Sequence, residues 1–87
     1  MRGLSAEQLL IIADEVCAVH KVSVVSFAAL SAASGVSGAS LHGVDVHGSV
    51  EEMAHAVART ITRLGPLSGA NDVFAEVTAR VLLSLNS

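Results

Sequence analysis

Apolar residues recur at helical spacing in four stretches of the chain, and the first stretch has the clearest boundaries. Ser5 and Gln8 have the spacing of an N-terminal capping box. Lys21 supplies a cation, which suits the C-terminal end of a helix. The sequence therefore predicts a helix that begins after Ser5 and fades over residues 18–21. Its inward positions are Leu9, Ile12, Ala13 and Val16, with Leu4 placed to pack against Leu9.

The second stretch follows residues 22–25, which allow a short extended segment. A helical period starts at about Ser26, so we predict a second helix from there. Gly35 and Gly38 are expected to end it. The positions that define its period are Phe27, Leu30, Ala33 and Ser34.

A segment without helical period, residues 37–49, precedes the third stretch. It is rich in glycine, so we expect an ordered loop with a short piece of strand at 44–46. A second capping-box pattern, Ser49 with Glu52, predicts the start of a third helix. Gly65 and Pro66 are expected to stop this helix. Its apolar face is predicted to hold Met53, Val57, Ile61 and Leu64, with Ala54 and Ala58 beside them.

The fourth stretch follows a short glycine-rich loop. Asn71 is a favourable N-cap residue, so we predict that a fourth helix begins there. Its apolar stripe is predicted to be Phe74, Val77, Val81 and Leu85. The four stretches together predict one all-α domain over residues 1–87, a compact bundle of about four helices.

The composition predicts that part of the apolar surface stays exposed. Apolar residues make up 52% of the chain and charged residues 15%, which is typical of a folded protein. A chain of 87 residues buries only about 60–65% of its unfolded surface. Because a contiguous apolar patch on a small protein usually marks an interface, we expect a protein partner and a homo-oligomer.

Charge and cysteine content argue against several classes of function. The net charge is −3 and the five Lys and Arg residues are scattered, so direct nucleic-acid binding is not expected. The single cysteine, Cys17, lies in an apolar helical run and is expected to be an inert thiol. Asp14 and Glu15 interrupt the N-terminal apolar run, so no signal peptide or membrane span is predicted. We expect a cytoplasmic protein.

Three segments together resemble the Fic/Doc family. The opening "LSAEQLLIIADEV" is similar to the N-terminal helix of Doc-type members. The stretch "LHGVDVHGSVEEMAHAV" is similar to the segment before the family's long helix, with Gly43 and Asp45 matching. His42 and His47 stand where aromatic residues are common, and Gly48 replaces a proline. The third segment, "GPLSGANDV", aligns without a gap to the signature loop His–x–Phe–x–Asp–(Gly/Ala)–Asn–(Lys/Gly)–Arg. The resemblance implies a shortened Fic/Doc fold.

The resemblance also implies that the loop has lost the family's chemistry. Family members transfer a phosphate or a nucleotide monophosphate to a protein hydroxyl, with the loop histidine as general base. Gly65 stands at the histidine position, Gly69 at that of the metal-holding acid, and Val73 at that of the phosphate-clamping arginine. The other loop positions are Pro66, Leu67 in place of the aromatic residue, Ala70, Asn71, which matches, and Asp72, whose carboxylate would compete with a phosphate.

We therefore predict a non-catalytic protein-interaction module without a cofactor, acting in or derived from a toxin–antitoxin system. The partners that the resemblance implies are a second copy, a related toxin or an antitoxin-like peptide. The alternative is a residual nucleotide-binding transferase that moves a phosphoryl or nucleotidyl group to a protein hydroxyl. Backbone amides at residues 70–72 would then hold the phosphate. Loss of a general base alone costs about 10²–10⁴-fold in rate, which favours the first hypothesis.

Three histidines, His42, His47 and His55, lie close in sequence to Asp45. Their spacing matches no standard zinc pattern, so no metal site is predicted. The resemblance places Asp45 and His47 in the family's substrate-binding flap. A structural role is the expected one for His47.

Overall fold

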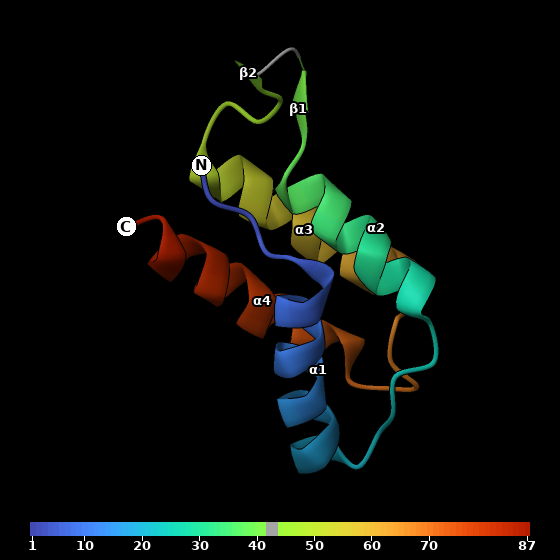
Figure 1. Ribbon diagram of the computed structural model, residues 1–87. Helices are drawn as coiled ribbons and strands as arrows, with labels where there is room; N and C mark the ends of the chain where they lie inside the picture. Colours follow the sequence, from blue (N-terminus) through green and yellow to red (C-terminus); the bar gives the residue numbers. More distant parts are fainter. Residues whose placement is uncertain (42–43) are drawn as a thin grey trace.

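The computed structural model describes residues 1–41 and 44–87, which form four helices and one short hairpin (Figure 1). The prediction of a compact all-α bundle of about four helices is confirmed. The strands of the hairpin pair antiparallel, with Ser40 opposite Asp45 and Leu41 opposite Val44. The elements are α1 (Ala6–His20), α2 (Phe27–Ser37), β1 (Ser40–Leu41), β2 (Val44–Asp45), α3 (Val50–Leu64) and α4 (Asn71–Leu85).

Side-chain caps start the first and third helices as the sequence predicts, with one difference. The Ser5 Oγ atom accepts from the Gln8 N–H at 3.1 Å, and the Gln8 side chain accepts from the Ser5 N–H at 2.9 Å. This is the full capping box of α1. In α3, Ser49 accepts from the Glu52 N–H at 3.1 Å. The Glu52 carboxylate instead accepts from the N–H of Gly48 at 2.8 Å, one residue before the cap.

Glycine ends two of the helices. The prediction for α2 is right at its start, where Ser26 is the N-cap, and wrong at Gly35, which lies inside the helix. A glycine inside a helix costs only about 0.5–1 kcal/mol relative to alanine, so α2 continues to its C-cap at Gly38. Gly65 ends α3 as predicted, with a φ of 59° that favours glycine.

The core lies where α3 packs against both α2 and α4, while α1 packs on α2 and α4 from the other side (Figure 1). The side chains of Leu9, Leu30 and Phe74 are almost completely buried at its centre. On α3, the predicted face is confirmed at Met53, Val57 and Ile61 but not at Leu64, which is 48% exposed.

The predicted stripe of α4 is right at Phe74 and wrong at its other three positions. The buried side chains of α4 are Phe74, Ala75, Thr78 and Leu82. Val77, Val81 and Leu85 are only partly buried. The apolar residues of α4 cover more than one face of the helix, so their spacing alone does not decide which face is buried. Contact with α3 buries the face that carries Phe74. Val77 and Val81 lie on the side of α4 that faces α1.

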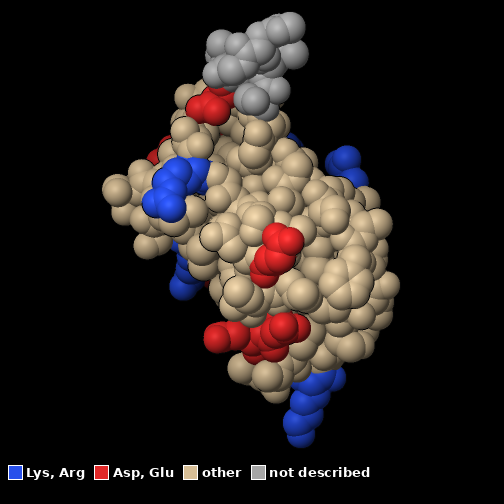
Figure 2. Space-filling model, viewed as in Figure 1, with Lys and Arg blue, Asp and Glu red and all other residues tan. Residues whose placement is uncertain are grey.

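The bundle is as compact as an ordinary protein of its size. Its accessible surface of 4976 Å² is close to the value of about 4800 Å² expected for 8.8 kDa. Several large apolar side chains nevertheless lie on the surface. The face of the molecule seen in Figure 2 is mostly uncharged. Among the residues whose burial is described, five large apolar side chains are 60–76% exposed, those of Ile11, Val19, Val25, Phe27 and Val46. No helix among the described residues is long and apolar enough to cross a membrane.

Candidate functional site

The predicted signature loop, residues 65–73, is joined by hydrogen bonds to the segment between α1 and α2. The Pro66 carbonyl accepts from the N–H of Val25 at 2.8 Å and of Ser26 at 3.2 Å. The Ser68 N–H donates to the Ser23 carbonyl at 2.8 Å, and the Ser23 N–H donates to the Ser68 Oγ at 3.0 Å. The predicted extended segment at 22–25 is thus present, and it pairs with this loop.

Asn71 holds the loop closed. Its Oδ1 atom accepts from the Leu67 N–H at 3.0 Å, and its Nδ2 atom donates to the Leu67 carbonyl at 2.9 Å. The Leu67 side chain is 3% exposed and belongs to the core, as expected for a loop anchor. The prediction that Asn71 is the N-cap of α4 is wrong. Ala70 is the N-cap, with a φ of 57°, and its methyl group offers no hydrogen bond to the helix. Asn71 lies inside the helix, and its side chain bonds Leu67 instead.

The two glycines of the loop differ in how strongly the structure requires them. Gly65 adopts a φ of 59°, where a side chain would be strained. Gly69 lies so close to Val22 that an added Cβ would stand 3.1 Å from the Val22 Cγ1. Turn geometry therefore accounts for glycine at Gly65, the position that the family resemblance assigns to the base, while a side chain at Gly69 would require Val22 to shift slightly.

The loop offers little to a nucleotide. Gly65 and Gly69 have no side chain, and Val73 is apolar, so the three aligned positions provide neither a proton acceptor nor a metal ligand nor a guanidinium. The first turn of α4 has no side-chain cap, which leaves N–H groups that an anion could contact. Asp72 is exposed in that turn and already provides a negative charge for the helix dipole.

Replacing Asp72 by alanine is expected to lower the free energy of unfolding by about 0.3–1 kcal/mol, since the favourable interaction with the helix dipole is lost. Urea unfolding followed by circular dichroism measures this change. A loss above about 2 kcal/mol would contradict a purely electrostatic role.

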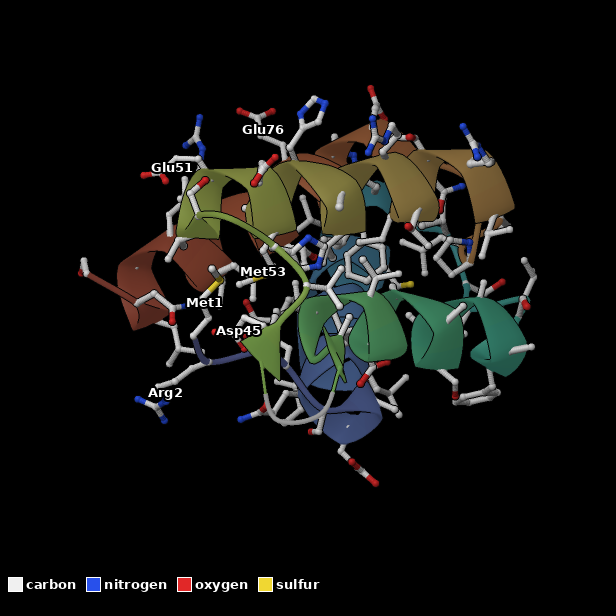
Figure 3. All side chains as sticks on the ribbon, turned by 90° about the horizontal axis from the view of Figure 1, so that it is seen from above. Met1, Arg2, Asp45, Glu51, Met53 and Glu76 are labelled. Carbon is white, nitrogen blue, oxygen red and sulfur yellow. The ribbon has the colours of Figure 1, made fainter. Side chains whose placement is uncertain are left out.

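The structure does not bring the predicted flap to this loop. The hairpin precedes α3 and the loop follows it, so they lie at opposite ends of a helix of about 22 Å (Figure 1). Asp45 accepts from the amino group of Met1 at 3.2 Å (Figure 3). The His47 Nε2 atom lies 2.9 Å from the Val36 carbonyl, so this ring joins the loop before α3 to the end of α2.

The histidines do not form a metal centre with Asp45 in the part of the chain that the structure describes, where no group of three metal-ligating residues occurs. His47 and His55 line a second hollow beside α3, with Glu51, Glu52 and Arg59. His42 and Gly43 lie outside the described residues.

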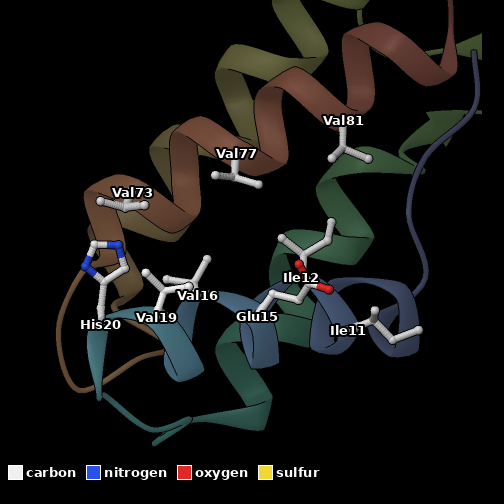
Figure 4. A pocket seen from close by; sticks show the side chains of 9 residues that line it. All are labelled: Ile11, Ile12, Glu15, Val16, Val19, His20, Val73, Val77 and Val81. Atoms are coloured by element: carbon white, nitrogen blue, oxygen red, sulfur yellow. The ribbon is translucent and has the colours of Figure 1, made fainter.

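An apolar groove between α1 and α4 is the main feature that the sequence patterns did not predict (Figure 4). It has a volume of about 470 Å³. One wall is a row of valines that repeats every four residues along α4, and the other is the side of α1. The lining residues are Ile11, Ile12, Glu15, Val16, Val19 and His20 from α1, and Val73, Val77 and Val81 from α4.

The groove is open rather than enclosed. Ile11 and Val19 stand on its α1 side and are 64% and 76% exposed. Small-molecule pockets of about 300–1,000 Å³ bury most of the ligand surface and place several polar groups around it. This groove has a similar volume but offers only Glu15 and His20 as polar groups. Its shape and chemistry suit the apolar face of a helix.

Comparisons with protein-family models, with curated proteins and with solved structures found no match.

Proposed function

We propose that this protein is a non-catalytic interaction module that binds a helix of a protein partner in the groove between α1 and α4. The observation that carries the proposal is the open valine-lined groove, whose α1 side exposes two large apolar side chains. Amphipathic helices bind such grooves through apolar residues at positions i, i+3, i+4 and i+7. Their burial supplies the free energy of association.

The chemistry of the loop supports the non-catalytic part of the proposal. An enzyme of the Fic/Doc type needs a base, a metal ligand and an anion clamp, and the aligned residues Gly65, Gly69 and Val73 provide none of these. The hydrogen-bonding groups of Asn71 are occupied by Leu67. On the basis of the resemblance, we also propose that the module acts in, or derives from, a toxin–antitoxin system.

The groove can be tested with helical peptides. We expect a display library of amphipathic 15-residue helices to yield binders whose NMR chemical-shift changes map to α1 and α4. Ile11→Asp should weaken their binding at least about tenfold, because a carboxylate replaces an apolar contact. Val46→Asp is the matched control, since Val46 is also exposed, at 60%, but lies beside the hairpin. Binders that map to another surface, or that tolerate Ile11→Asp, would contradict the proposal.

The transferase alternative has its own test. We expect titration with ATP and Mg²⁺ to leave the NMR signals of residues 65–73 unchanged. Micromolar binding at Ala70–Asp72, or transfer of a labelled phosphate to a protein, would show that the loop still acts on nucleotides.

A further inference from the structure

We infer that the helix bound in the groove is basic, with Lys or Arg residues along the edge of its apolar stripe that faces α1. The inference rests on the proposed function, because it names the chemistry of the occupant of the same groove. The distribution of charge on the two walls of the groove supports it.

The negative charge of the protein is concentrated on α1. This helix contains Glu7, Asp14 and Glu15 and no Lys or Arg, so its formal charge equals the −3 of the whole chain. All three carboxylates are exposed, and none of them makes a salt bridge within the described residues. The rest of the chain carries equal numbers of acidic and basic residues. The wall that α1 provides is therefore acidic.

Two of these carboxylates belong to the row of side chains along the groove side of α1. This row is spaced by four residues, so its members run along one side of the helix, and all four are exposed: Glu7, Ile11, Glu15 and Val19. The last three line the groove (Figure 4). A helix that lies along this row meets carboxylates and apolar side chains in turn.

Lys and Arg suit such a row better than other residues do. Their long apolar stems pack against apolar side chains while the charged end stays in water. A stem that lies on Ile11 or Val19 brings its positive charge close to Glu15, which stands between them in the row. An acidic partner residue at the same place would face an unpaired carboxylate, and like charges across an interface repel.

The wall that α4 provides is uncharged. Its lining residues are three valines, Val73, Val77 and Val81. The charged residues that precede two of these valines in the sequence, Glu76 and Arg80, form a salt bridge with each other at 2.6 Å. The edge of the partner helix that faces α4 therefore needs no charge, and the basic residues are expected on the α1 edge alone.

Three 15-residue amphipathic peptides that share one apolar face test the inference. They differ only along one edge of the apolar stripe, where the residues are Lys, Gln or Glu. Fluorescence anisotropy measures their binding to the full chain at about 0.1 M ionic strength, where the Debye length is about 10 Å. We expect the Lys peptide to bind at least about tenfold more tightly than the Glu peptide, with the Gln peptide between them. At about 1 M, where the Debye length is about 3 Å, the difference should fall below about threefold.

Reversal of one charge on the row identifies the surface. Glu15→Lys should lower the preference for the Lys peptide over the Glu peptide at least about fivefold, because it turns attraction into repulsion for one peptide and the reverse for the other. Glu51→Lys is the matched control. It changes the net charge equally, but at the start of α3 in the second hollow, so the preference should stay within about twofold of the wild type. Circular dichroism of each variant confirms that it is folded.

The outcomes separate the inference from the proposed function. Equal binding of the three peptides in the groove, or equal effects of Glu15→Lys and Glu51→Lys, would overturn the inference and leave the proposed function intact. Tighter binding by the Glu peptide, or by a peptide with the acidic sequence of α1 itself, would also overturn it and indicate an acidic partner or a second copy. If none of the peptides shifts the NMR signals of α1 and α4, the proposed function fails together with the inference.

Discussion

Leu67→Asp is expected to unfold or strongly destabilise the protein at room temperature. Leu67 is 3% exposed and packs in the core, so the change removes an apolar side chain and buries a carboxylate. The expected loss is about 4 kcal/mol or more, which is at the upper end for single substitutions. A domain of 87 residues has only about 4–13 kcal/mol of stability in total. Loss of the helical circular dichroism signal and of dispersed NMR resonances measures the effect.

Leu64→Asp is the matched control for this prediction. Leu64 is three residues earlier in the chain and is 48% exposed, so its carboxylate stays in water. Its cost should be about 1 kcal/mol or less, mainly from an acidic group at the C-terminal end of α3. Equal losses for the two variants would show that Leu67 does not anchor the loop.

The sequence predicted well those features that depend on neighbouring residues. Ser5 and Gln8 cap α1 because both partners lie within one helical turn. Gly65 ends α3 because few other residues adopt its positive φ without strain. Ser26 begins α2 because its side chain accepts a hydrogen bond from the Ala29 N–H, three residues later. Each of these contacts is decided within about four residues, so a single sequence is sufficient to find it.

Features that depend on distant contacts were predicted poorly. Both Phe74 and Val77 fit the period of α4, and only the position of α3 decides which faces the core. Asn71 has a good N-cap side chain, but the same side chain can bond the backbone four residues earlier. The competing partner, Leu67, is fixed in place by the core and by the pairing of the loop with residues 23–26.

The groove was missed for a related reason. Val73, Val77 and Val81 repeat every four residues, and so do Ile11, Glu15 and Val19. Such rows are usual for core-facing helices, so the pattern alone does not separate a buried row from an exposed one. The exposed part of the row becomes apparent only when α1 and α4 are placed relative to each other (Figure 4). The apolar excess of the composition was the indirect signal of this surface.

Asn71→Ala is expected to lower the free energy of unfolding by about 2–4 kcal/mol. It removes two hydrogen bonds, of 3.0 and 2.9 Å, and leaves the Leu67 N–H and carbonyl without their side-chain partner. A partly buried backbone group that loses its partner costs about 1–3 kcal/mol. Urea unfolding measures the loss, and hydrogen exchange at the Leu67 amide should become faster in the variant.

Asn71→Asp separates the two bonds, because its carboxylate keeps the acceptor for the Leu67 N–H and loses the donor to the Leu67 carbonyl. Its added charge in the first turn of α4 is favourable to the helix dipole. Its second oxygen, however, replaces the donor 2.9 Å from the Leu67 carbonyl and repels it, so Asn71→Asp should recover only part of the stability that Asn71→Ala loses. If Asn71 instead served a nucleotide, Asn71→Ala would leave stability within about 0.5 kcal/mol of the wild type and abolish nucleotide binding. If Asn71 instead serves to hold Leu67 through its two hydrogen bonds, we expect the opposite result: Asn71→Ala lowers the stability strongly, and the groove between α1 and α4 still binds a helix.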